Sequence, residues 1–323
     1  MSVRTQILLL AAHALLAQPD RFGLPACELP GQELATRSAF VLCHSASLRV
    51  PVWTAYEITP ERLNGRAQRP RHFRRDLVLA QPGASDSDYR NSGWVRGHLV
   101  PAADMAWSED ALRDSFLFSN AVPQNAALNS GKWRVLEGAV RKLAAGADFV
   151  LVFTGPVFCP DDARIGANQV AVPCQIFKVV VAGRGQARHA FAAILPNGYN
   201  PAEPLAHFAC SIAEVERRTG LDFLNALPGA EQAELESTAE PLPGLRNSGP
   251  ETVGEGAPAI ACKYLGSARQ CTKPMQFVSR KNRNSLLPQS HPGNDFARKV
   301  AEPATLGSWT PVRSLFDNRI TSP

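Results

Sequence analysis

The chain has 323 residues, of which 45% are hydrophobic and 20% charged, which is ordinary for a soluble globular protein and excludes compositional extremes. The length allows one large domain or two small ones. The net charge of +5 and the pI of about 8.9 suit a polyanionic partner, but so small an excess excludes no class of protein by itself.

The N-terminus has the pattern of a short secretory signal peptide. Arg4 precedes an apolar run over residues 7–17, and small residues suitable for cleavage lie within that run. The run is too short for a permanent membrane anchor, and no other segment resembles a transmembrane helix. We therefore expect a signal peptide at 1–17 and a lead-in segment at 18–37. The mature protein is then secreted or periplasmic; the alternative is an ordinary buried N-terminal helix.

The seven cysteines suggest disulfides, because export places thiols in an oxidising compartment. Nearness along the chain favours three pairs and leaves Cys210 free, the pairs being Cys27–Cys43, Cys159–Cys174 and Cys262–Cys271. Sequence alone does not determine this connectivity. The paired CxxC spacing of a structural zinc site is absent from the sequence.

Strand-like segments come mostly in groups along the chain. Their composition and flanking turn residues predict strands at 40–43, 48–58, 148–158, 175–183 and 189–197. Apolar spacing predicts a helix over 128–143, and a second helix at 211–218 ends before Gly220, which suits a C-terminal cap. Because strands and helices are segregated rather than alternating, the predicted fold class is α+β.

The composition changes at about residue 238. The segment 238–323 is rich in proline, and from Arg246 onward it has 11 Lys and Arg against 5 Asp and Glu, a net charge of +6. Such a segment packs poorly. We expect a largely disordered basic tail at 238–323, which adds nonspecific attraction to nucleic acid.

Residues 94–145 carry most of the unusual chemistry. Hydrolysis of a phosphodiester needs a base for water, a cation that offsets charge on the phosphate oxygens, and donors that hold the phosphate. The imidazole of His98 suits the first task, and the carboxamide of Asn129 offers a neutral oxygen ligand for Mg²⁺. Arginines such as Arg96 and Arg141 supply paired donors to phosphate.

A helix over 128–143 would place Asn129, Trp133, Glu137 and Arg141 on one broad face, because steps of four residues rotate by only about 40°. The Cα atoms of Asn129 and Glu137 would then be about 12 Å apart, which disfavours direct ligation of one ion by both. Glu137 is better suited to hold a metal-bound water. Each residue also has an ordinary structural interpretation, as a helix cap, a core side chain or a surface ion pair.

The order and spacing of three motifs along the chain favour a functional role for these residues over the separate structural interpretations. VRGH at 95–98, SNAVPQ at 119–124 and NSGKWRVLE at 129–137 resemble the DNA/RNA non-specific endonuclease family, whose patterns are DRGH, TN-x-x-PQ and N-x-x-x-W-x-x-LE. The resemblance covers about residues 38–228. It implies a ββα-metal (His-Me finger) nuclease fold at 38–237, with a central antiparallel sheet flanked by helices.

The resemblance also implies a role for each matching residue. His98 is the general base that activates water, and Asn129 is the single protein ligand of Mg²⁺, or of Mn²⁺ in its place. Glu137 holds a metal-bound water. Arg96 and Arg141 contact phosphate or stabilise the transition state.

Other positions support the site or depart from the family pattern. Arg71 matches a phosphate-contacting arginine. Asn120 and Gln124 support the site and orient its groups, Asn120 together with the catalytic residues and Gln124 together with the substrate-binding residues. Val95 replaces the aspartate that begins the family's first motif. We expect a hydrogen bond to be missing there, with a lower rate or metal affinity and with the chemistry retained.

Contacts with the phosphate backbone carry no direct sequence information, so the expected substrates are DNA and RNA alike. The resemblance also allows a homodimer. Two other functions remain open. One is a nucleic-acid-binding protein of the same fold that has lost catalysis, for which Val95 and the basic tail speak. The other is a phosphodiesterase that acts on a substrate other than a polynucleotide.

Overall fold

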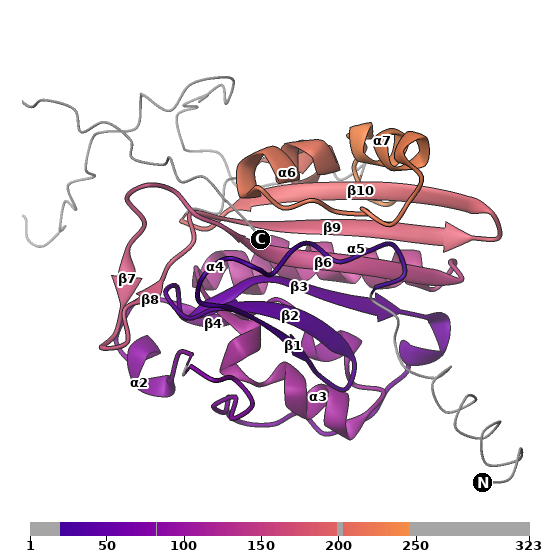
Figure 1. Ribbon diagram of the computed structural model, residues 1–323. Coiled ribbons are helices and arrows are strands. Elements are labelled where there is room, and N and C mark those ends of the chain that lie inside the picture. Colours follow the sequence, from indigo (N-terminus) through magenta and orange to yellow (C-terminus); the bar gives the residue numbers. More distant parts are fainter. Residues whose placement is uncertain (1–19, 82, 199–202, 246–323) are drawn as a thin grey trace, which may run out of the picture. The chain divides into compact units, whose positions relative to one another are not determined.

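The computed structural model describes residues 20–81, 83–198 and 203–245, shown as ribbons in Figure 1. The chain divides into two units at 1–257 and 258–323, and every element named below belongs to the first. The predicted signal peptide at 1–17 lies outside the described residues. The tail predicted at 238–323 was wrong at its start, because residues 238–245 are described and bury Leu242 and Leu245 in the core. The rest of the predicted tail, from residue 246 onward, lies outside the described residues.

An antiparallel sheet of seven strands forms the centre of this unit, in the order β1-β2-β3-β6-β9-β10-β11. The strands are β1 (Gln32–Thr36), β2 (Phe40–Ser45), β3 (Val50–Ile58), β6 (Phe149–Val157), β9 (Gln175–Arg184), β10 (Ala187–Pro196) and β11 (Ala209–Cys210). All five predicted strands are confirmed. The segment at 18–37, expected only as a lead-in, contributes β1, which pairs with β2 at the edge of the sheet.

Alternation along the strands buries both faces of the sheet. Val150 and Val152 of β6 pack in one apolar core with α5 (Arg134–Ala144), whereas Leu151 and Phe153 pack in the other. The second core contains apolar side chains of α6 (Ile212–Thr219) and α7 (Gly229–Ser237). Figure 1 shows α6 and α7 on one side of the sheet and α5 on the other. The expected α+β fold with a flanked antiparallel sheet is therefore confirmed.

A separate two-stranded unit carries the first two motifs. Strand β4 (Val95–His98) pairs antiparallel with β5 (Ala121–Gln124), and His98 lies opposite Ala121. The chain then enters α4 (Ala126–Leu128), whose N-cap is Asn125. Two antiparallel strands followed by a helix form the expected ββα arrangement.

The helix predicted over 128–143 is present but is not continuous. A π-helical turn, η4 (Asn129–Trp133), joins α4 to α5, and Gly131 within it has the non-helical angles φ −100° and ψ −111°. The prediction that Asn129, Trp133, Glu137 and Arg141 share one face of a regular helix was therefore wrong for Asn129. Glu137 and Arg141 share α5, whereas Asn129 lies before the break. Glycine explains the break, since its lack of Cβ tolerates such angles.

Short elements complete the described part of the chain. They are η1 (Pro60–Arg62), α2 (Asp86–Tyr89), η2 (Ala102–Asp104), α3 (Glu109–Ser115), η3 (Phe118–Asn120), β7 (Arg164–Ile165), β8 (Val170–Ala171) and η5 (Leu205–Phe208). Gly220 ends α6 with a φ of 71°, as its position in the sequence predicts. Among the described residues, none of the helices has the length and apolar character needed to cross a membrane.

Two of the three predicted disulfides are confirmed. Cys27–Cys43 ties the segment before β1 to β2, and Cys159–Cys174 closes the loop between β6 and β9. Cys210 is a free thiol, as expected. The predicted pair Cys262–Cys271 lies outside the described residues.

Candidate active site

His98 ends strand β4 and lies among aromatic rings. Its ring centroid is 4.7 Å from that of Phe73 and 4.8 Å from that of Phe116. Within the described residues its Nε2 atom is buried and has no hydrogen-bond partner. Burial, and secondarily the positive charge of Arg69, lowers the pKa of His98 to about 3. The imidazole is therefore neutral at neutral pH, which is the form that accepts a proton.

Residues 69–76 (RPRHFRRD) form a basic segment, and the charge of its Arg69 acts on His98. Its guanidinium lies 5.2 Å from the centroid of the Phe116 ring, which itself contacts His98 edge-on. Arg71, chosen from the sequence as the phosphate contact, is exposed and has no ion pair within the described part of the chain. Motif matching selected Arg71 from this segment and missed Arg69.

The basic segment is fixed to the rest of the unit at its C-terminal end. Asp76 forms a buried ion pair with Arg37 and accepts a hydrogen bond from the Ser119 hydroxyl. The backbone of Arg74 donates to Phe116 and accepts from Phe118. These bonds hold the segment beside the residues that precede β5, and so bring Phe73 and Phe116 to His98.

Asn120 joins two backbone segments near His98 through its side chain. Its side-chain oxygen accepts from the Val100 amide at 2.9 Å, and its nitrogen donates to the carbonyls of Val100 and Ser115 at 2.9 and 2.8 Å. Its own carbonyl accepts from the Leu99 amide at 3.0 Å. Asn120 is buried, and its side chain is thus engaged with the backbone. This arrangement suits the predicted supporting role rather than contact with a substrate.

Gln124 is buried at the end of β5 and lies against Gly97. A Cβ at position 97 would come within 2.0 Å of Gln124 Oε1 and 2.7 Å of its Cβ. Glycine at 97 is therefore required by this close approach. Within the described residues, neither polar atom of the Gln124 amide has a hydrogen-bond partner. The amide is enclosed at the β4–β5 pair. This position suits the predicted support of the site better than the predicted binding of substrate.

Asn197, which follows β10, connects the ββα unit to the large sheet. Its side chain donates to the carbonyls of Pro123 and Pro173 at 2.9 and 2.8 Å and accepts from the Asn125 amide at 3.0 Å. Asn125 in turn accepts from the amides of Ala127 and Leu128. The start of α4 is thereby fixed just before Asn129. Sequence reasoning missed Asn197, whose role rests on contacts 72 and 74 residues away.

Asn129 begins the π-helical turn. Its backbone amide donates to Asn125, while its half-buried carboxamide forms no hydrogen bond to another described residue. π-turns inside helices are frequent at functional sites. A carboxamide oxygen without a protein partner, next to an unwound turn, is available as a ligand for a hard cation.

Glu137 and Arg141 belong to a compact set of charged groups beneath α5. Arg141 donates to Asp104 at 2.7 Å, and Asp104 also accepts from the Tyr56 hydroxyl at 3.0 Å. Burial raises the pKa of Glu137 to about 7, opposed by the charges of Lys178 and Arg141 and reinforced by that of Asp104. The set therefore combines two acidic side chains with two basic ones, and its members are Glu137, Asp104, Lys178 and Arg141.

Arg96 and Val95 lie toward the surface. The Arg96 guanidinium forms an ion pair with Asp86 at 2.9 Å, with both side chains largely exposed. Val95 pairs with Gln124 at the end of β4 opposite to His98. The missing carboxylate at position 95 is thus three residues from the base along an extended strand, and it is not a neighbour of His98 in the ladder.

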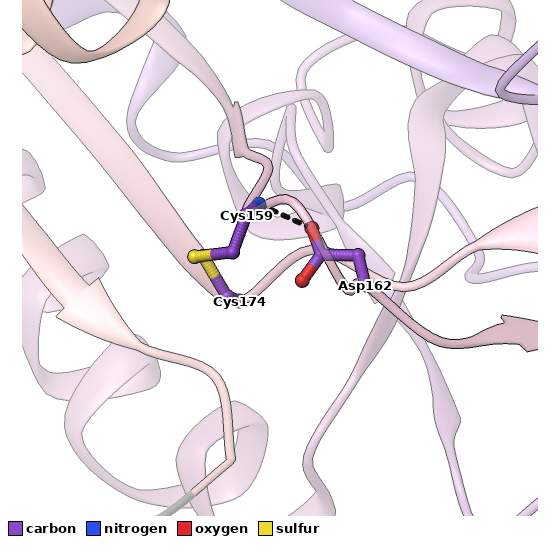
Figure 2. A group of neighbouring side chains, drawn as sticks. All are labelled: Cys159, Asp162 and Cys174. Atoms are coloured by element: carbon purple, nitrogen blue, oxygen red, sulfur yellow. Dashed lines mark hydrogen bonds between the residues drawn. A yellow bond between two sulfur atoms is a disulfide. The ribbon is translucent and has the colours of Figure 1, made fainter. Parts of the chain in front are cut away.

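Asn129 and Glu137 both offer oxygen atoms, which suit a hard cation, and the Asn129 carboxamide has no hydrogen-bond partner among the described residues. Another group of potential ligands is excluded by its chemistry. Figure 2 shows Cys159, Asp162 and Cys174, whose sulfur atoms form a disulfide while Asp162 accepts from the Cys159 amide at 2.7 Å. A disulfide offers no thiolate to a metal.

The fold and the ordered motifs define a nuclease of the ββα-metal class. The family model of DNA/RNA non-specific endonucleases matches residues 19–230, and the chain belongs to this family. Its members hydrolyse phosphodiester bonds and are typically metal-dependent, and nucleic acids are their substrates.

Individual relatives agree with this assignment. Human mitochondrial endonuclease G is 37% identical over 219 residues, which span 63% of this chain and 72% of that protein. Mitochondrial nuclease EXOG of Danio rerio is 35% identical over 233 residues, or 67% of this chain and 66% of that protein. A crystal structure of an EndoG/EndoGI complex superposes with a TM-score of 0.61 at 28% identity, covering 65% of this chain and 91% of that chain.

Proposed function

We propose that this protein is a Mg²⁺-dependent, sugar-nonspecific endonuclease that cleaves DNA and RNA with His98 as the general base. The observation that carries the proposal is the position of His98 at the end of β4, in edge contact with Phe116, over whose ring the guanidinium of Arg69 lies. A neutral imidazole has a nitrogen lone pair that can accept a proton from water, and a nearby guanidinium offers donors to phosphate.

Each residue has a defined task in this mechanism. We assign proton transfer to Nδ1 of His98, because Nε2 is enclosed. Asn129 would hold the cation through its carboxamide and Glu137 through water, and the bound Mg²⁺, or Mn²⁺, would offset charge on the phosphate and the leaving oxygen. Arg141, which Asp104 orients, donates to the phosphate as charge develops.

The exposed arginines explain why sugar and base identity matter little. Arg69, Arg71 and Arg96 all present donors that suit phosphate oxygens, and Arg96 would exchange Asp86 for substrate. Contacts of this kind address the backbone alone. Binding should therefore weaken as salt rises, for DNA and RNA alike.

Secretion or export to the periplasm is part of the proposal. Two disulfides within the described residues suit an oxidising compartment, as does the signal-like pattern at residues 1–17. Expression of the full chain in a bacterial host, followed by mass determination of the exported product, tests it. Loss of the first residues supports export, whereas an intact cytoplasmic chain contradicts it. The homodimer stays a prediction, to be checked by analytical ultracentrifugation.

The decisive experiment compares wild type with His98→Ala and His189→Ala on supercoiled plasmid and on total RNA, in Mg²⁺ and in EDTA. His189 is an exposed histidine of β10 and serves as the matched control. We expect cleavage of both substrates by wild type and His189→Ala in Mg²⁺ only, and its loss in folded His98→Ala. Binding of plasmid without cleavage by the wild type would instead indicate a decayed site, as Val95 allows. Cleavage of small diesters alone would indicate a different phosphodiesterase.

A further inference from the structure

Lys178 is a buried cation to which the proposed mechanism gives no task. It lies in the middle of β9, between β6 and β10, and is 1% exposed. Its neighbours Phe177 and Val179 pack in the core under α6 and α7, so Lys178 is on the face that α5 covers. Its Nζ atom donates to Thr154 Oγ1 at 2.7 Å.

The ammonium also lies under the start of α5. Its Nζ atom is 4.9 Å from the centroid of the Trp133 ring, the last residue of the π-helical turn that Asn129 begins. Cation–π contacts of this kind are strongest where water is excluded. Lys178 therefore fixes the junction between the turn and the helix that carries Glu137.

Packing alone does not account for a lysine at this position. A buried ammonium is costly unless acids compensate it, and replacing a whole buried set of charges by apolar side chains often gives a protein that is equally or more stable. Here Glu137 and Asp104 provide the compensating charge, while Arg141 is the second base of the set. A lysine retained at such a cost points to a role in arranging these groups.

We propose that Lys178 is a positioning residue for phosphodiester hydrolysis, whose buried ammonium packs against Trp133 at the start of α5 and orients the Glu137 carboxylate through its charge. This inference rests on the proposed task of Glu137. Lys178 touches neither substrate nor metal in this scheme and acts through Glu137.

A double-mutant cycle separates this role from a merely structural one. Lys178→Met is prepared in the wild-type and Glu137→Gln backgrounds, and kcat and KM are measured on plasmid. We expect Lys178→Met to lower kcat about 10- to 100-fold with little change in KM, as for other residues that orient metal-site groups. In the Glu137→Gln background it should cause no further loss of kcat. The thermal midpoint should fall, because removal of the ammonium leaves buried acids uncompensated, so kcat is compared at a temperature at which every variant is folded.

A second readout does not depend on activity. Binding of Mn²⁺ alone, measured by electron paramagnetic resonance, should be weaker in Lys178→Met than in wild type. Thr154→Val is the matched control, since it removes the hydrogen bond of Lys178 and keeps the charge; it should retain most of the activity. Lys178→Gln replaces Lys178→Met if the latter does not fold.

Three results would overturn the inference. They are full activity of the folded Lys178 variant, an equal additional loss in the Glu137→Gln background, and unchanged activity of Glu137→Gln itself. A wild-type protein that binds Mn²⁺ but cleaves no nucleic acid would contradict the proposed function instead, and the Mn²⁺ measurement would still report on Lys178.

Discussion

Asp104 anchors Arg141 from beneath α5, with 2.7 Å between the carboxylate Oδ1 and the guanidinium Nη1. The Asp104 side chain is fully buried, whereas Arg141 remains 27% exposed, so the pair links the interior to the surface. Burial raises the pKa of Asp104, and Arg141 opposes that shift. The charged form of Asp104 is therefore stabilised by Arg141, and Asp104 in turn orients the Arg141 guanidinium.

Asp104→Asn should lower kcat about tenfold or more, because Arg141 loses the charge that fixes its position. It should also lower the free energy of unfolding by roughly 1–3 kcal/mol, since a buried charge-assisted hydrogen bond is lost. Tyr56→Phe removes only the other hydrogen bond of Asp104 and is the control. Urea denaturation and plasmid cleavage measure both effects; an Asp104→Asn variant with wild-type kcat would remove Asp104 from the mechanism.

Arg69→Gln should move the acid limb of the pH profile of kcat/KM to higher pH. The positive charge of Arg69 adds to burial in lowering the pKa of His98, so its removal raises that pKa back toward 6.5. The base is then lost by protonation at a higher pH. The value of kcat/KM at neutral pH should also fall by roughly tenfold through a lost phosphate contact, equal to about 1.4 kcal/mol.

Arg71→Gln provides the comparison for Arg69, since both side chains are exposed arginines of one segment. It should weaken binding without moving the acid limb. The same shift in both variants would mean that general surface charge, and not the contact of Arg69 with Phe116, acts on His98.

His44→Leu should be less sensitive to acid than the wild type. His44 is buried beside Gly83, and burial lowers its pKa to about 4 although Asp76 opposes the shift. The unfolded chain then binds more protons than the native protein between pH 6.5 and about 4, so the neutral imidazole contributes stability that is lost as pH falls through this window.

The difference in unfolding free energy between wild type and His44→Leu should therefore change by about 1.4 kcal/mol per pH unit within that window. Guanidinium denaturation at pH 7, 6 and 5 measures it. Taking differences cancels the opposite contributions of acids such as Glu216, whose pKa burial raises to about 7. A pH-independent difference would show that the pKa of His44 is the same in the native and unfolded states.

Gly97→Ala should destabilise the protein by roughly 1–3 kcal/mol, because the new Cβ overlaps Gln124. Loss of activity should accompany it, since position 97 adjoins His98. Gly138→Ala is the matched control, because its new Cβ would meet only Arg141, at 3.9 Å. In a helix interior, the change from glycine to alanine raises the free energy of unfolding by about 0.5–1 kcal/mol. Thermal melts and plasmid cleavage separate the two, and equal stability of both variants would exclude the contact at Gly97.

Several features of the fold were predictable because they are local in the sequence. Turn residues and apolar runs predicted the strands β2, β3, β6, β9 and β10. Nearness along the chain predicted Cys27–Cys43 and Cys159–Cys174, whose separations are 16 and 15 residues. The motifs predicted the family and selected His98, Asn129 and Glu137, since chemistry restricts which residue types serve at those spacings.

The sequence by itself thus determined which residue types and which order of motifs the protein has, whereas the tertiary structure decided how the groups are paired and charged. The pairing of Asp104 with Arg141 and Tyr56 spans 37 and 48 residues, and the contact of Arg69 with Phe116 depends on Asp76 holding the segment in place. The break at Gly131 likewise depends on backbone angles that a helical repeat does not reveal. Burial of Lys178, and the pKa shifts of His98 and Glu137, arise only when distant segments exclude water from these groups.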